Sequence, residues 1–333
     1  MGDVAMTIPV IRALVNQNPA VKITVVSRPF FKPFFDSIDN VSFFAVDLKK
    51  RHKGFLGLIR LFLDLKKLNI DAFADLHNVL RSKVIRILFA LSGKKVAFTD
   101  KGRTEKTELT RAENKIFKPL KSMFKRHVDT FFKLGFSVDL SKPNFPEKAV
   151  LSTEIKTIIN FDENEKLIGI APFAQYQSKV YPIDLMQNVI DVLAANELNK
   201  VVLFGGGTQE ITLLNQLANN KKNIIVVAGK LNLTHELHLI SNLKVMLSMD
   251  SGNAHLAAML GVQVITLWGA THPFAGFAPF NQPLDNCLVA DKNQFPLLPT
   301  SVYGNKNMVG YEDAMRTILP EKVIEKINLA LKN

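Results

Sequence analysis

The chain has 333 residues, of which 47% are hydrophobic, and a formal net charge of +12 at pH 7. This length favours two domains over one core, and the single cysteine, Cys287, excludes an internal disulfide and a thiolate metal cluster. No apolar run reaches the ~18 residues of a membrane span, and no leader pattern opens the chain, so we expect a cytoplasmic protein.

The first half alternates strand and helix patterns. Val4, Ile8, Ile11 and Val15 have helical spacing from the start, and no strand pattern precedes them. Strands are predicted at 22–26, 41–46, 71–76 and 95–98, and helices at 55–68 and 79–91. A nucleotide-binding half normally begins with a central strand, so we expect this first strand to be missing and the natural reading frame to start roughly ten residues upstream.

The second half repeats the alternation more regularly. Strands are predicted at 167–171, 201–204, 224–227, 244–248 and 263–268, and helices at 183–195, 209–218, 233–241 and 253–260. Two prolines within 141–146 indicate a linker. The pattern predicts two doubly wound, Rossmann-like α/β domains, 1–145 and 146–333, which face each other across a cleft. Residues 311–331 predict one helix, broken at Pro320, that could pack back on the first domain.

The positive charge is concentrated in one stretch. Residues 49–126 carry 21 Lys and Arg against 7 Asp and Glu, whereas the rest of the chain carries 21 against 23. Such an excess attracts nucleic acid, an anionic membrane face or a phosphorylated substrate, unless it merely forms a soluble face. Residues 117–126 interleave Phe with Lys and Arg, which is typical of a peripheral membrane contact or of an amphipathic helix packed on its own domain.

The most informative motif is MDSGNAHLAA at 249–258, which follows a predicted strand and opens a helix of small residues. Such a turn directs free backbone N–H groups and the positive end of a helix at a ligand, and this favours a phosphate. Ser251, Gly252 and Asn253 would offer these donors, and Gly252 would allow a close approach. We expect Asp250 to organise the loop or to contact the ligand.

Three segments together resemble one known family, the ADP-heptose:lipopolysaccharide heptosyltransferases of glycosyltransferase family 9. MGDVAMTIPVIRAL at 1–14 resembles the first loop and helix of the family, DSGNAHLAA at 250–258 its second signature, and LWGATHP at 267–273 its third. The resemblance implies a GT-B fold and an inverting transfer of a sugar, with heptose from ADP-heptose as the first choice, to a lipopolysaccharide core acceptor.

The resemblance also implies partners. They are a nucleotide-diphosphate sugar, an anionic lipopolysaccharide precursor and the inner face of the cytoplasmic membrane, where the protein would be peripheral. The basic first domain would attract such an acceptor. Nucleic acid is not expected, and no acceptor-binding residue is assigned.

An inverting transfer needs a carboxylate that takes the acceptor proton. Asp3, beside Gly2 and ahead of a helix, would supply it; from the sequence alone, a helix N-cap is the preferred role, and the resemblance reverses that preference. The resemblance also implies that His255 and Thr271 bind the donor with Asp250. Without it, His255 is typical of a packed residue.

Two loops after predicted strands complete the expected donor site. Lys179, between an apolar strand and a helix, matches a family lysine, and its charge would neutralise the departing diphosphate, although most loop lysines only face water. Gly206 lies in a glycine turn that could admit the adenosine end of the donor, which is a weak signal.

Several other chemistries lack their motifs. The chain has no Asp-x-Asp pair, no P-loop and no metalloprotease histidine pair, so we expect a metal-independent enzyme without a cofactor. Two alternatives stay open. One is a GT-B enzyme that uses another nucleotide sugar, for N-acetylglucosaminyl transfer or epimerisation, and the other is a non-catalytic binder of anionic glycolipid or nucleic acid.

Overall fold

The computed structural model describes residues 1–332, which divide into two compact α/β units. The first unit holds Met1, Asp3–Arg103 and Lys121–Asn144. The second unit holds Gly2, Thr104–Leu120 and the residues from Phe145 onwards. One junction therefore falls in the proline-containing stretch near residue 145, whereas the assignment of residues 104–120 to the second unit is a feature that the sequence did not indicate.

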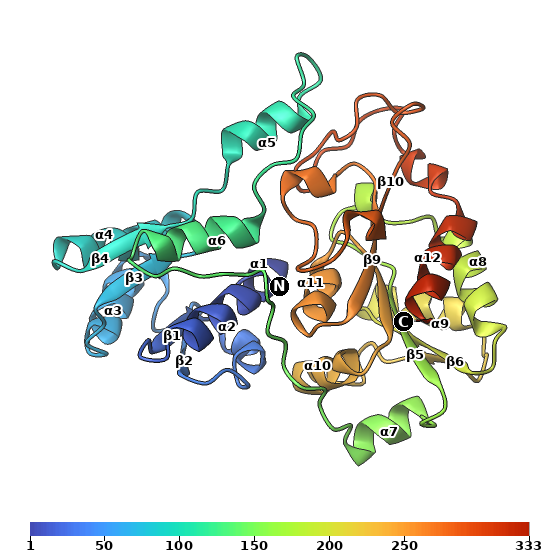
Figure 1. Cartoon of the computed structure of the whole chain (residues 1–333), viewed down its shortest axis with the longest axis horizontal. Coiled ribbons are helices and arrows are strands. Elements are labelled where there is room, and N and C mark those ends of the chain that lie inside the picture. Colours follow the sequence, from blue (N-terminus) through green and yellow to red (C-terminus); the bar gives the residue numbers. More distant parts are fainter. Residues whose placement is uncertain (333) are drawn as a thin grey trace. The chain divides into compact units, whose positions relative to one another are not determined.

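The second unit is built on a six-stranded parallel sheet with the order β10-β9-β8-β5-β6-β7 (Figure 1). Its strands are β5 (Lys166–Ala171), β6 (Asn199–Leu203), β7 (Ile224–Val226), β8 (Val245–Met249), β9 (Gln263–Trp268) and β10 (Cys287–Val289). The inner strands β6 and β8 are buried along their whole length, and their sequences, NKVVL and VMLSM, are mostly apolar, as in other parallel sheets. The first strand, β5, lies between β6 and β8, and this arrangement is the doubly wound topology expected from the sequence.

Helices precede, separate and follow the strands of this sheet along the chain. They are α7 (Thr153–Ile159), α8 (Ile183–Ala194), α9 (Thr208–Ala218), α10 (Leu233–Ser241), α11 (Gly252–Met259) and α12 (Pro320–Ala330). Their apolar faces and the strands form one core around Ile168, Ile190 and Leu247. The four helices predicted at 183–195, 209–218, 233–241 and 253–260 thus agree with α8 to α11 within about two residues, the uncertainty of any helix end. Helix α7 was not predicted.

The C-terminal helix is shorter than expected. Residues 311–319 contain only the 3-10 turn η5 (Ala314–Thr317), and α12 begins at Pro320. Proline fits the first turn of a helix because its missing N–H has no partner there, so Pro320 starts a helix and does not break one. The prediction of one helix over 311–331 was wrong for its first half. Within the second unit, α12 packs against α8, as Figure 1 also shows, and against β8 and β9.

The first unit contains four strands in two separate parallel pairs. These pairs are β1 (Ile23–Ser27) with β2 (Val41–Ala45) and β3 (Ala72–Asp75) with β4 (Lys95–Phe98). Helices α3 (Gly54–Lys66) and α4 (Leu80–Leu91) bury their inner faces in a core that includes Val26, Phe44, Phe73 and Val96, one from each strand. Among residues 1–332 no strand precedes the first helices, and the missing inner strand stays a prediction.

The remaining helices of the first half are α1 (Gly2–Ala5), α2 (Ile8–Gln17), α5 (Arg103–Thr110) and α6 (Met123–Phe132), and η1 (Pro29–Phe34) is a 3-10 helix. The predicted opening helix is split in two at Thr7, whose hydroxyl donates a hydrogen bond to the Val4 carbonyl at 2.7 Å. Helix α2 is buried from Ile8 to Val15. Within residues 1–332, no helix has the length and apolar character needed to cross a lipid bilayer.

Candidate functional site

The carboxyl edge of the second sheet brings three predicted loops together. In the parallel register, Ala171 of β5 lies beside Ser248 of β8, and Met249 of β8 lies beside Leu267 of β9. The chain therefore leaves these neighbouring strands at the same edge. The segments that carry Lys179, Asp250 and Thr271 follow the three strands, and ligands of doubly wound folds bind at this edge.

Asp250 is the centre of this site. Its carboxylate accepts a hydrogen bond from the Thr271 hydroxyl at 2.8 Å and forms an ion pair with the Lys179 ammonium at 3.2 Å. The ammonium also donates to the Asp250 main-chain carbonyl. The side chains of Lys179 and Asp250 are only 12% and 10% exposed. These contacts join Asp250 to Lys179 and Thr271. The two roles expected for Asp250, organising the loop and contacting the ligand, stay predictions.

A second loop fixes the segment around Lys179, and the sequence did not indicate it. The Ser178 hydroxyl donates to the Gly304 carbonyl at 2.7 Å, and the Ser178 carbonyl accepts from the Ala270 amide at 3.1 Å. A Cβ atom on Gly304 would lie 2.6 Å from Cγ of Lys179, and the φ of Gly304 is +83°. Glycine is required here because no other residue combines this conformation with such a close approach.

The turn from β8 into α11 has the form of an anion site. Ser251 precedes the helix, but its side chain does not cap it; the Ser251 hydroxyl lies 3.0 Å from that of Ser248. The N–H groups of the first turn, which begins with Gly252 and Asn253, have no partner within the helix, and the positive end of the helix dipole adds to their attraction for anions. His255 follows in the same helix and is 7% exposed.

Gly206 lies on the same edge, one strand further along. Gly206 follows β6, and its amide donates a hydrogen bond to the Glu210 carboxylate at 2.7 Å. Glu210 is in the first turn of α9, so this bond links the glycine turn to the helix that follows. Gly206 itself is exposed. No hydrogen bond or ion pair within residues 1–332 joins Gly206 to Asp250, and its role in binding the adenosine end stays a prediction.

Residues 104–120 complete the second unit beside Thr271. The Lys115 ammonium donates to the carbonyls of Leu297 and Pro299. The Phe117 ring lies 5.0 Å from the rings of His272 and Phe274, and the Lys292 ammonium lies 3.2 Å from its centroid. Phe117 thus packs within the second unit, although the residue is still 38% exposed.

His272 has an unusual environment. It is 7% exposed, its Nδ1 accepts a hydrogen bond from the Phe274 amide at 3.1 Å, and burial, followed by the nearby Lys292, lowers its pKa to about 4. An Nδ1 that accepts a hydrogen bond carries no proton, so the ring is neutral at pH 7. In the unfolded chain His272 takes up a proton near its ordinary pKa of 6.5, whereas in the folded protein it does so only near pH 4. The contribution of neutral His272 to the free energy of unfolding should therefore be complete above pH 6.5 and be lost as the pH falls from 6.5 to 4.

We therefore expect the free energy of unfolding of the second unit to depend on His272 in mildly acidic solution. Between roughly pH 7.5 and pH 5 this residue should cost about 2 kcal/mol. His272→Asn, which retains an acceptor for the Phe274 amide, should remove that part of the pH dependence in urea unfolding followed at both pH values. His238→Asn in α10 is the control, and an equal change in both variants would contradict the assignment to His272.

In the first unit, Asp3 lies beside a histidine that sequence reasoning missed. Asp3 is in the first turn of α1, its side chain is 68% exposed, and its Oδ2 lies 4.0 Å from Nε2 of His77. Burial lowers the pKa of His77, and the nearby Lys101 lowers it further. The residue that precedes α2 is Thr7, so Asp3 does not cap that helix, and the capping alternative is wrong for it.

A buried carboxylate, that of Asp75, anchors the loop that carries His77. Asp75, at the end of β3, accepts hydrogen bonds from the Asn78 amide at 2.6 Å and from Arg86 at 3.2 Å. The Asn78 side chain donates to the Thr99 carbonyl after β4 at 2.9 Å. The signal available in the sequence was the position of His77 and Lys101 after two predicted neighbouring strands.

Within residues 1–332, no group of three or more His, Cys, Asp or Glu side chains is arranged to hold a metal ion. His235 and His238 of α10 lie with ring centroids 6.4 Å apart, and His235 approaches Glu154 at 3.5 Å. The absence of a metal requirement stays a prediction.

Comparison with known sequences identifies the family. The family model of glycosyltransferase family 9 (heptosyltransferase) matches residues 58–302. The chain belongs to this family. This glycosyltransferase is 25% identical, over 292 residues, to the lipopolysaccharide core heptosyltransferase OpsX of Haemophilus influenzae, covering 86% of this chain and 80% of that protein. It is 21% identical to lipopolysaccharide heptosyltransferase 3 of Escherichia coli, with 89% of this chain and 88% of the relative covered.

Solved structures confirm the GT-B fold class. A family 9 glycosyltransferase from Veillonella parvula matches with a TM-score of 0.75 and 19% identity, over 100% of this chain and 95% of that one. E. coli ADP-heptose LPS heptosyltransferase II matches with a TM-score of 0.68 and 19% identity, over 99% and 95% of the two chains. E. coli WaaC with ADP-2-deoxy-2-fluoro heptose matches with a TM-score of 0.66 and 18% identity, over 98% and 96%.

Proposed function

We propose that this glycosyltransferase is an inverting, metal-independent heptosyltransferase that moves heptose from ADP-heptose to an anionic lipopolysaccharide core acceptor. The names of the relatives support the sugar and the acceptor class. The observation that carries the proposal is the joint arrangement of Asp250, Lys179 and Thr271 beside the uncapped start of α11, because it offers a cation and backbone N–H donors to a diphosphate.

The reaction assigned to these residues is a single displacement. The acceptor hydroxyl attacks the anomeric carbon, the bond from that carbon to the diphosphate oxygen breaks, and the Asp3 carboxylate takes the acceptor proton. Lys179 and the N–H groups at the start of α11, with Ser251, Gly252 and Asn253, stabilise the negative charge that develops on the diphosphate. Thr271 and Asp250 position Lys179. In this proposal His255 and Gly206 also contact the donor, and the enzyme works in the cytoplasm at the inner face of the membrane.

The test is a transfer assay with the purified full chain. ADP-heptose, UDP-sugars and GDP-sugars are each supplied with a core acceptor that lacks heptose, with and without excess EDTA, and the anomeric configuration of the product is determined by NMR. We expect transfer from ADP-heptose with inversion, unchanged by EDTA. Conversion of a nucleotide sugar without acceptor would identify an epimerase, and heat stabilisation by ADP without any turnover would identify a binder; either result overturns the proposal.

A further inference from the structure

The first unit exposes an apolar stripe on α4. Leu80, Ile87 and Leu91 are 79%, 54% and 80% exposed, whereas Ile85 and Phe89 of the same helix are buried in the core. The spacing of seven and four residues places the three exposed side chains on one side of the helix. Water-facing helices rarely carry such a stripe, so it marks a surface that meets something apolar.

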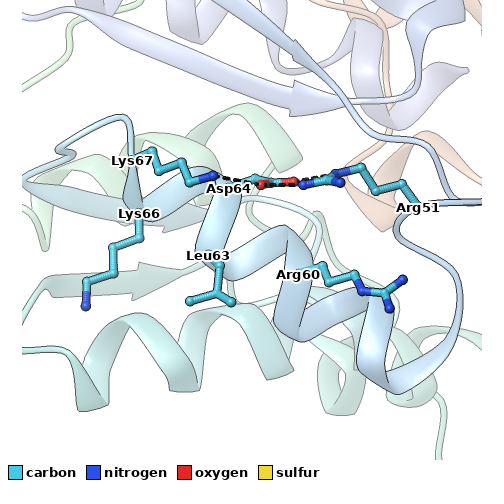
Figure 2. A pocket seen from close by; sticks show the side chains of 6 residues that line it. All are labelled: Arg51, Arg60, Leu63, Asp64, Lys66 and Lys67. Atoms are coloured by element: carbon cyan, nitrogen blue, oxygen red, sulfur yellow. Dashed lines mark hydrogen bonds and ion pairs between the residues drawn. The ribbon is translucent and has the colours of Figure 1, made fainter.

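The neighbouring helix α3 also exposes a leucine and adds positive charge. Leu63 is 51% exposed, and it lines a surface pocket of about 440 Å³ together with Arg60 and Lys66. Figure 2 shows these three side chains along one side of α3 with Leu63 between the two cations, while Arg51 and Lys67 reach Asp64 elsewhere on the helix. No ion pair within residues 1–332 engages Arg60 or Lys66.

A second pocket, of about 570 Å³, joins the two helices. Phe55 and Leu58 of α3 line it together with Leu80 and Val84 of α4. Helices α3 and α4 also pack against each other. We define the outer face as the exposed residues of these two neighbouring helices: Leu63, Leu80, Ile87 and Leu91, with the cations Arg60 and Lys66.

Charge decides between possible occupants of the outer face. Residues 49–95 carry 12 Lys and Arg against 3 Asp and Glu. Of these three acids, Asp64 is bound by Arg51, and Asp75 is buried against Arg86. A second copy of the chain on the same face would bring like charges together, whereas an anionic bilayer supplies both negative head groups and an apolar layer.

We propose that the outer face is a membrane-docking surface, on which α3 and α4 lie in the plane of an anionic phospholipid bilayer with Leu63, Leu80, Ile87 and Leu91 among the acyl chains. The inference rests on the proposed function in one respect: it assumes that the acceptor is anchored in the membrane by its lipid. Leu80 comes only three residues after His77, the neighbour of Asp3. A bilayer on this face therefore keeps the lipid anchor of the acceptor near the proposed base.

The test measures co-sedimentation of the full chain with vesicles of phosphatidylethanolamine containing phosphatidylglycerol, against vesicles of phosphatidylcholine alone. Wild type should bind the anionic vesicles, and added salt should weaken binding. Ile87→Glu with Leu91→Glu should weaken binding at least about tenfold, and Arg60→Gln with Lys66→Gln roughly fivefold for each cation removed.

Matched controls come from the second unit. Val192→Glu with Leu329→Glu, two exposed helical positions, and Lys322→Gln with Lys326→Gln should leave vesicle binding unchanged. Equal weakening in the controls, no binding by wild type, or self-association of wild type that Ile87→Glu with Leu91→Glu abolishes would overturn the proposal. Thermal unfolding of each variant verifies that it is folded.

A separate assay keeps this inference distinct from the proposed function. Transfer to a lipid-free core oligosaccharide in solution should be the same for wild type and for Ile87→Glu with Leu91→Glu. Absence of that transfer in wild type counts against the heptosyltransferase activity, whatever the vesicles show. Loss of vesicle binding without loss of soluble transfer in the outer-face variant supports the docking surface.

Discussion

Asp3→Asn is expected to lower kcat by ~10²- to 10⁴-fold, the usual contribution of a general base. An amide cannot take the acceptor proton, whereas the residues proposed to bind the donor all belong to the second unit and are not changed. ADP binding, measured by calorimetry, should therefore remain as in wild type. Single-turnover assays should show that the variant is slowed only in the transfer step.

The matched control for this prediction is Asp71→Asn, which changes another exposed carboxylate of the first unit. It should leave kcat within a factor of about two, because a lone surface charge contributes little. An Asp3→Asn enzyme with wild-type kcat would remove Asp3 from the mechanism. His77→Gln tests the neighbour at 4.0 Å and should alter the pH profile of kcat more than its maximum.

Asp250→Ala should lower the free energy of unfolding of the second unit by about 3 kcal/mol, and its Tm by roughly 6–12 °C. The change removes the carboxylate that faces Lys179, and a largely buried ammonium is then left without its counter-ion. The Thr271 hydroxyl also loses its acceptor. Calorimetric melting of wild type and variant measures the shift.

An exposed ion pair of the same unit is the control. Asp184 pairs with Arg316, and their side chains are 61% and 47% exposed, so Asp184→Ala should cost less than about 1 kcal/mol. Asp250→Leu combined with Lys179→Met should recover part of the lost stability, because no buried charge is then unpaired. Equal shifts for Asp250→Ala and Asp184→Ala, or no recovery in the double variant, would contradict the role given to this pair.

Five of the six described strands of the second unit, all but β10, were predictable because their signal is local. The predicted strands contain short apolar runs, such as VMLSM in β8, and helices such as α8 repeat their apolar residues every three or four positions. Helix α5 was missed since its sequence, RTEKTELT, has no apolar period. Its placement depends on tertiary contacts, for example the Lys106 ammonium 4.0 Å from the Phe277 ring centroid.

The donor side of the site was predictable in part for the same reason. A strand that ends in Asp-Ser-Gly before a helix identifies Asp250 and the start of α11 without distant information. The contacts of Lys179 required the register of β5 and β8, and the loop that closes over it depends on Gly304, which lies 125 positions later in the sequence. On the first unit, only the fold brings His77 to Asp3.

The discontinuous second unit has a consequence for how the chain is made. Residues 104–120 emerge from the ribosome long before the loops that receive them, and the bond from Lys115 to the Leu297 carbonyl spans 182 positions. Contacts of such sequence separation are slow to form, and residues 104–120 cannot take their place in the unit until residues 297–299 have been synthesised. A protease cut after Asn144 would therefore not release a carboxyl-terminal fragment that folds by itself. Lys115 and Phe117, which contact Leu297 and His272, would remain on the amino-terminal fragment.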